Sequence, residues 1–195
     1  MSTLQESMQT VMRAFQIQRE FFQNVSDLFA LVDHEMKKSE PSYTAVATDG
    51  SILSSEIDVD LFQPKQCQIR HLAFPLRPTS DESLPLLLVH VCVDEAYASL
   101  PEVWLGSFSE IETRTHEAFP YPDAISSLFQ DYFGPNPEWR EIGSWYEETV
   151  SDGEISACIG FCRIPLSRLT DPAAVRKEIC TRFLDRLQIL KKRAD

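Results

Sequence analysis

The chain has 195 residues, of which 43% are apolar, and a formal net charge of −12. This length is sufficient for one well-filled core, whereas two domains would each be small. No run of eighteen apolar residues is present and the N-terminus is amphipathic, so we expect a soluble, cytoplasmic protein without a membrane span or secretory signal.

The charge is distributed unevenly along the sequence. Residues 1–90 carry −5, residues 91–160 carry −12 and residues 161–195 carry +5. Phosphate contacts need clustered Lys and Arg, so the acidic middle disfavours nucleic acid and anionic membranes as partners. A basic protein is the partner that this charge favours, and the basic tail is the one exception to the acidity.

Apolar side chains recur at steps of four and three along the first forty residues. The row consists of Leu4, Met8, Val11, Phe15, Phe22, Val25, Phe29, Val32 and Met36, and only Gln18 interrupts it. Such a heptad repeat predicts a helix with one continuous apolar stripe. As one helix, residues 4–38 would span about 50 Å, which exceeds the ~38 Å expected for a globule made of the rest of the chain.

Two arrangements would cover a stripe of this length. The helix pairs with a second copy or with another protein's helix, or it breaks near Asn24 to Asp27 and folds back on its own sheet. In the first arrangement the protein is a homodimer, with Phe15, Phe22 and Phe29 as partner-binding residues.

Strand and turn patterns follow the helix. We expect strands at 43–48 and 51–59 around Asp49-Gly50, at 66–76, at 84–93, at 101–113 with Gly106 as a bulge, and at 139–150 and 154–164 around Asp152-Gly153. The runs at 84–93 and 155–164 are apolar on both faces, which places them inside the sheet. A short amphipathic helix is expected at 124–133.

The last predicted element is a helix with a clear N-terminal signal. Asp171 is a capping residue, Pro172 occupies the first helical position, and one face then carries Val175, Ile179, Phe183, Leu187 and Leu190. The order of elements predicts an α+β fold, namely a mainly antiparallel sheet with a long N-terminal helix, a short middle helix and a C-terminal helix. We divide the chain into an amphipathic helical segment, 1–40, and an α+β domain, 41–195.

The search for chemistry finds no catalytic constellation. A Gly-x-Ser-x-Gly elbow and a glycine-rich phosphate loop are both absent from the sequence. Thiols and imidazoles share strand faces, but their spacing is not that of a zinc knuckle, so we expect core thiols, no metal and no cofactor. The pairs are Cys67 with His71, His90 with Cys92, and Cys158 with Cys162. With Cys180 the cysteines number five, an odd number that indicates reduced thiols.

Aromatic residues are concentrated in the acidic middle of the chain. Residues 119–146 contain eight of the twenty aromatics, interspersed with Asp and Glu. Aromatic anchors rimmed by charge are typical of protein-binding hot spots. We expect Tyr121, Trp139 and Trp145 to be the exposed members and to bind a partner.

These features favour a non-enzymatic acidic protein-interaction module, adaptor-like or chaperone-like, that self-associates through its N-terminal helix. Two alternatives stay open. A small-ligand sensory domain of the PAS or GAF kind would use a pocket lined by His71, His90 and Cys92. An enzyme without a recognised motif would use His90 with Asp94 and Glu95, which follow the central strand.

Overall fold

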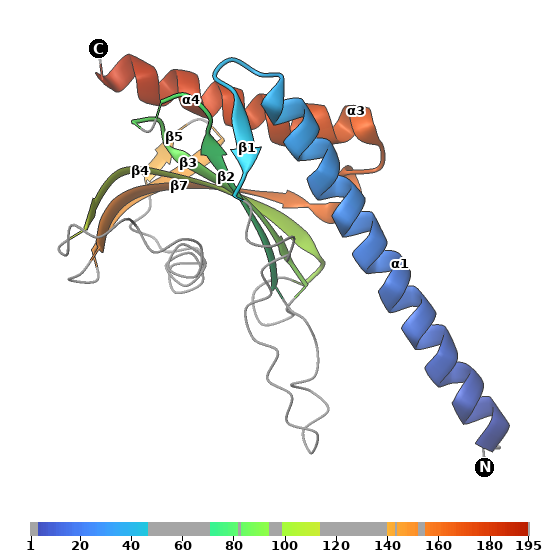
Figure 1. The fold of residues 1–195 in the computed structure, drawn as a ribbon. Helices are drawn as coiled ribbons and strands as arrows, with labels where there is room; N and C mark the ends of the chain where they lie inside the picture. Colours follow the sequence, from blue (N-terminus) through green and yellow to red (C-terminus); the bar gives the residue numbers. More distant parts are fainter. Residues whose placement is uncertain are drawn as a thin grey trace.

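The computed structural model describes residues 4–46, 71–81, 83–93, 99–113, 140–142, 144–151 and 155–194. Seven strands form one antiparallel sheet in the order β1-β2-β3-β4-β7-β6-β5. Helices lie over one face of this sheet, as Figure 1 shows. The α+β fold with a mainly antiparallel sheet, a long N-terminal helix and a C-terminal helix is therefore confirmed. The strands are β1 (Tyr43–Ala45), β2 (His71–Pro78), β3 (Leu86–Cys92), β4 (Glu102–Thr113), β5 (Arg140–Ile142), β6 (Trp145–Ser151) and β7 (Ile155–Pro165).

The N-terminal helix is continuous. Helix α1 (Leu4–Lys37) runs through 34 residues without a break at Asn24. Its sequence contains neither Gly nor Pro, so no residue interrupts the backbone hydrogen bonding. The predicted alternative of a broken helix is therefore wrong. The helix ends before Pro41, and the Oγ of Ser39 donates to the carbonyl of Met36 over 2.7 Å.

The C-terminal helical run begins as its sequence predicts. It comprises α3 (Pro172–Val175), a π-helical segment η3 (Arg176–Cys180) and α4 (Thr181–Ala194). The Oδ1 of Asp171 accepts a hydrogen bond from the backbone N–H of Ala174 over 2.9 Å, which confirms the predicted cap. Along its inner face Val175, Ile179, Phe183 and Leu187 are buried. An ion pair of 3.1 Å between Arg176 and Glu35 links this run to α1.

Both faces of the sheet are buried at its centre. The face under the helices contributes Leu72, Leu76, Leu87, Val89, Val91, Val103, Leu105, Trp145, Cys162 and Ile164 to a core shared with α1 and the C-terminal run. The opposite face carries a second cluster made of Ala73, Leu88, Cys92, Trp104, Phe108, Ala157, Ile159 and Phe161. Strands β3, β4 and β7 contribute to both clusters. The prediction that 84–93 and 155–164 are buried on both faces is confirmed.

Two details of the sheet differ from the sequence prediction. The bulge in β4 lies between Ser109 and Glu112, where Glu110 has a φ of 54°, and not at Gly106. Gly106 pairs in register with both neighbouring strands, because it lies in the crowded middle of the sheet rather than near a strand end. The predicted strand 139–150 is a hairpin of β5 and β6 with Ile142 opposite Trp145. In the sequence the two strands are separated by Gly143-Ser144, a turn-forming pair that the strand pattern alone does not reveal.

Several predicted elements lie outside the described residues. These are the middle helix at 124–133, the strand at 51–59 and both Asp-Gly turns. Within the described part of the chain, the short helical element between the sheet and the C-terminal run is only a 3-10 turn, Leu166–Arg168.

A buried ion pair joins α4 to the sheet. The side chain of Arg186 is 0% exposed, and its Nη2 lies 2.6 Å from Oε2 of Glu147 on β6. Its Nε donates to the Oγ of Ser107 on β4 over 3.0 Å. The guanidinium lies 5.6 Å from the ring centroid of Trp145. Arg193, which lies about two turns further along α4, also donates to both carboxylate oxygens of Glu147, over 2.6 and 2.8 Å.

The sheet makes room for this guanidinium at a glycine. A Cβ added to Gly160 on β7 would lie 2.5 Å from Nη2 of Arg186 and 2.6 Å from Oγ of Ser107. Burial raises the pKa of Glu147, but hydrogen bonds from Arg193 and Arg186 outweigh it and hold the pKa below its usual value. Glu147 is therefore charged in the folded protein, and one carboxylate holds two arginines.

We expect Glu147→Gln to lower the free energy of unfolding by about 3–5 kcal/mol, because it leaves the Arg186 charge buried without a counter-ion. The pKa of Glu147 in the folded protein lies below its value of about 4.3 in the unfolded chain. The native protein therefore loses this stabilisation as the pH falls from the unfolded pKa through the folded pKa. The free energy of unfolding of the Glu147→Gln variant should lack this part of the decrease at acid pH. Urea titrations between pH 3 and 7 measure both effects. Asp185→Asn, at an exposed acid on α4, is the control and should stay close to the native protein.

We expect Gly160→Ala to destabilise the fold by about 1–3 kcal/mol, because the new methyl group overlaps the guanidinium. In an Arg186→Ala background the same substitution should cost less, since the overlap with the guanidinium is gone and only that with the Oγ of Ser107 remains. Urea unfolding of the two single variants and the double variant measures the coupling. Additive free-energy changes would contradict the close approach of the two residues.

Candidate functional site

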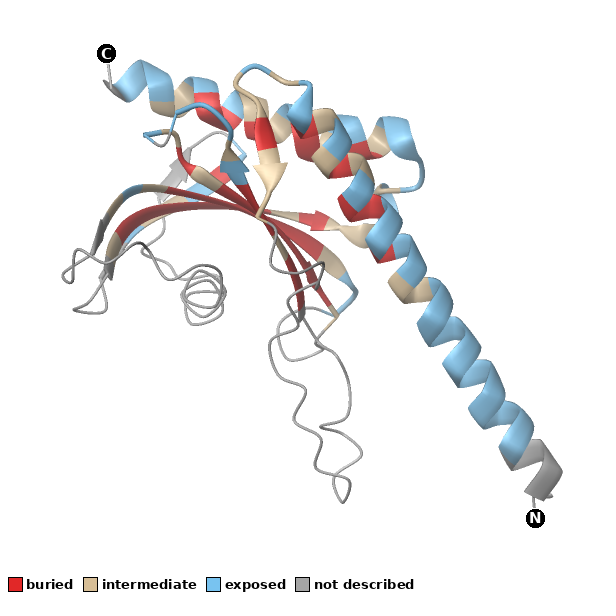
Figure 2. Cartoon of the chain, viewed as in Figure 1, coloured by how far each residue is buried: buried red, intermediate tan, exposed pale blue. Residues whose placement is uncertain are grey.

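The N-terminal half of α1 projects from the rest of the molecule. Every residue from Met8 to Glu20 is exposed. Figure 2 shows this part of the helix extending beyond the sheet and the other helices. At 1.5 Å per residue, thirteen such residues amount to about 20 Å of helix that no other described part of the chain covers.

Apolar side chains are concentrated on this projecting half. Met8 is 61% exposed, Val11 52%, Met12 69%, Phe15 64% and Ile17 58%; the only other large exposed apolar residues in the described part of the chain are Leu100 and Tyr146. Side chains of this size are seldom left in water as a group unless a partner covers them. The predicted stripe contains Met8, Val11 and Phe15. Met12 and Ile17 extend the apolar surface beyond it, a feature that the heptad pattern alone did not reveal.

The same stripe has two different environments. In the C-terminal half of α1, Val25 and Phe29 are 2% exposed and Val32 is 0% exposed, because they pack on the sheet. Phe22 is partly buried at the boundary and packs against this core. The heptad positions are thus buried by the chain itself from Val25 onwards and exposed from Met8 to Gln18.

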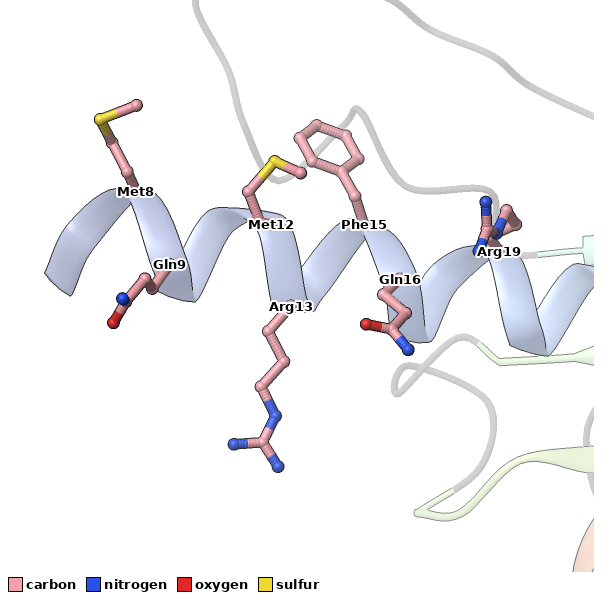
Figure 3. Close-up of a pocket in the computed structure, with 7 residues that line it drawn as sticks. All are labelled: Met8, Gln9, Met12, Arg13, Phe15, Gln16 and Arg19. Carbon is pink, nitrogen blue, oxygen red and sulfur yellow. The ribbon is translucent and has the colours of Figure 1, made fainter. Parts of the chain in front are cut away.

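A hollow runs along the projecting half. Its volume is about 900 Å³, and its described lining residues are Met8, Gln9, Met12, Arg13, Phe15, Gln16 and Arg19. Figure 3 shows Met8, Met12, Phe15 and Arg19 pointing to one side of the helix, whereas Arg13 points away from them. The lining is mainly apolar along one side and polar at its margins, which suits a helix or another apolar segment better than a small polar ligand.

The projecting half carries no net charge. Residues 1–20 contain two acids, Glu6 and Glu20, and two bases, Arg13 and Arg19, so the formal charge of −12 belongs entirely to residues 21–195. Gln16 donates to Glu20 over 2.9 Å along the helix surface. A partner, including a second copy, therefore meets no net repulsion from this segment itself.

The sequence-predicted partner residues fall into three groups. Phe15 is exposed and Phe22 half-buried, but Phe29 is buried, stacked on Phe74 with ring centroids 4.7 Å apart. The expectation that Trp145 is exposed is wrong: it is 1% exposed, because the Arg186 guanidinium and the C-terminal helix cover it. Tyr121 and Trp139 lie outside the described residues.

A second group of candidate residues lies on the sheet face opposite the helices. The ring of His90 stacks on Trp104 with centroids 5.5 Å apart, and both Cys92 and His90 are 0% exposed. Residue 71 pairs with Cys92 in the register of β2 and β3. The structure thus brings together the backbone positions predicted for a sensory pocket, whereas Asp94 and Glu95 lie outside the described residues.

The described cysteines are packed rather than poised for chemistry. Cys92, Cys158, Cys162 and Cys180 are free and buried, and burial raises the pKa of Cys180 to about 11. Burial likewise raises the pKa of Cys158 and Cys162. These thiols stay protonated near neutral pH and are poor nucleophiles. Cys67 is outside the described residues, and among the described ones no three His, Cys, Asp or Glu residues converge as metal ligands.

Helices long and apolar enough to cross a bilayer do not occur in the described part of the chain. Comparison with protein-family models, with curated proteins and with solved structures found no match.

We expect substitutions in the buried half of the stripe to lower the free energy of unfolding and those in the exposed half to leave it nearly unchanged. Phe29→Ala should lower the free energy of unfolding by about 3–5 kcal/mol, since it opens a cavity in the core. Phe15→Ala, the same substitution two heptads earlier, should change it by no more than about 0.5 kcal/mol in the monomer. Urea unfolding at a low protein concentration measures both. Equal losses from the two variants would mean that Phe15 is covered by its own chain.

Proposed function

We propose that the protein is a non-enzymatic protein-interaction module that self-associates through the projecting half of α1. One observation supports this proposal most directly: every residue from Met8 to Glu20 is exposed, and the segment continues the stripe that the sheet covers further along. An adaptor or chaperone-like role in the cytoplasm agrees with the acidic composition and with the buried, reduced thiols.

The energetics favour association. Full burial of a Val, Phe or Met side chain stabilises by roughly 1.5–3 kcal/mol. Each chain offers Met8, Val11, Met12 and Phe15, all more than half exposed. Association also costs translational and side-chain entropy. Because the stripe is short, we propose a reversible dimer rather than a permanent one.

The charge distribution favours self-association through paired helices over self-association through the acidic globular surface. The globular part, residues 21–195, carries the full −12, so two globular surfaces repel each other, whereas residues 1–20 are neutral. A further, basic protein would bind the globular part instead, and that complex would weaken as the salt concentration rises.

We expect the unmodified protein to have the mass of a dimer by size exclusion with light scattering at tens of micromolar concentration. Phe15→Glu should give a monomer, because it puts a charge into the covered stripe, and the far-UV circular dichroism of the sheet should stay the same. Thr10→Glu adds the same charge at an exposed position of the same helix that does not line the hollow, and it should remain dimeric. A native protein that is monomeric at this concentration would contradict the proposal.

A small-ligand sensory domain is the second candidate. It is favoured by the burial of His90 and Cys92 beside Trp104, on the sheet face opposite the described helices. Mass spectrometry of the denatured protein distinguishes the two functions, because a sensor would release a small molecule in stoichiometric amount. An enzyme using His90, Asp94 and Glu95 remains a third possibility, and of these three residues only His90 lies in the described part of the chain.

A further inference from the structure

We propose that the two α1 helices of the dimer pair in antiparallel orientation, with Val11 of each copy against the partner's Phe15. This inference rests on the proposed self-association through the projecting half of α1. It adds the orientation of the second copy and the register in which the two helices pair.

The globular part of the protein lies on the same side of α1 as the apolar stripe. The exposed residues Met8 and Phe15 and the buried residues Phe29 and Met36 occupy the same heptad position. A seven-residue repeat drifts by only ~20° per heptad on a straight helix, so the exposed and the buried stripe face roughly the same side. The sheet therefore lies on the side of the helix to which a partner helix must bind.

This placement disfavours a parallel pair. In a parallel pair equal residues lie at the same level, so both globular parts would occupy the seam side at the level of residues 25–36. They would compete for one space, and two bodies that each carry −12 would be brought together. In an antiparallel pair each globular part lies beyond the tip of the partner helix, and the seam stays free.

The antiparallel orientation fixes the register between the two α1 helices. In an antiparallel helix pair the two kinds of heptad position face each other, so Val11 lies opposite the partner's Phe15 and Met8 opposite the partner's Gln18. The same relation brings the tip of one helix to the level of Phe22 of the other. The overlap thus uses the uncovered length of the stripe and ends where the helix begins to pack on its own sheet.

Gln18, the single polar residue of the stripe, has different surroundings in the two orientations. A parallel pair would place the two Gln18 side chains opposite each other inside the seam. The antiparallel register places Gln18 at the end of the overlap, near the partner's Met8, where its amide still reaches water. The Phe15 rings likewise meet the smaller Val11 instead of each other, which alternates large and small residues across the seam.

Two single cysteine variants distinguish the orientations. In the antiparallel register Ala14 lies next to the partner's Ala14 beside the two-fold axis, whereas Gln18 is far from its own copy. In a parallel pair Gln18 faces its own copy in the seam, whereas Ala14 does not. Both residues are exposed on the projecting half, so neither variant disturbs the core.

The experiment treats Ala14→Cys and Gln18→Cys with a short bismaleimide and measures covalent dimer by denaturing electrophoresis. We expect at least a tenfold excess of dimer from Ala14→Cys. The unmodified protein, treated in the same way, controls for Cys67 and the buried thiols, and a Cys67→Ser background removes any signal from that residue. Light scattering on each untreated variant reports whether dimer is present.

Each outcome has a distinct meaning. Crosslinking of Ala14→Cys alone supports the antiparallel pair. Crosslinking of Gln18→Cys alone, or of both variants equally, overturns the orientation and leaves self-association through α1 standing. Monomeric variants that do not crosslink, together with a monomeric native protein, overturn both the orientation and the proposed function.

Discussion

The pairing of Arg186 with Glu147 is the constraint on which the arrangement of helix and sheet depends. A guanidinium with no exposure is stable only with a counter-charge and hydrogen-bond acceptors in reach. Glu147 on β6 and Ser107 on β4 supply them from both sides of β7, and Gly160 on β7 leaves the space between. Helix α4 can therefore take only one position along the sheet. Apolar packing of Phe183 and Leu187 then fills the surroundings of the ion pair.

This ion pair also explains how a chain with a segregated charge distribution folds. Acids of the middle segment, residues 91–160, pair across the sheet with bases of the adjoining C-terminal segment, residues 161–195. Glu147 meets Arg186 and Arg193, and Glu102 on β4 meets Arg163 on β7 at 2.7 Å. The +5 of residues 161–195 is thus partly neutralised within the molecule.

Much of the fold could be predicted because local signals agree with the tertiary structure. Asp171 and Pro172 fix a helix start, and runs that are apolar on both faces mark the inner strands. Trp145 was misplaced because its exposure depends on Arg186, a residue 41 positions later, and no local pattern carries that information. The bulge at Glu110 was missed for a similar reason, since register along β7 decides it rather than the glycine content of β4. For the candidate site, the heptad repeat predicted that the apolar positions share one face of a helix. It did not predict at which residue the sheet begins to cover that face.

The boundary at Phe22 has a consequence for how order is distributed along α1. Forming the first turn is the costly step of helix formation, and the packed half supplies that nucleus, so the projecting half needs only propagation. Propagation without tertiary contacts is nearly neutral, so we expect order in the projecting half to decrease from Phe22 towards Met8. In an antiparallel pair the weakest turns of one helix lie beside the best-supported turns of the other. Each copy then supplies the other's missing support, and protein concentration sets how far the helix is formed.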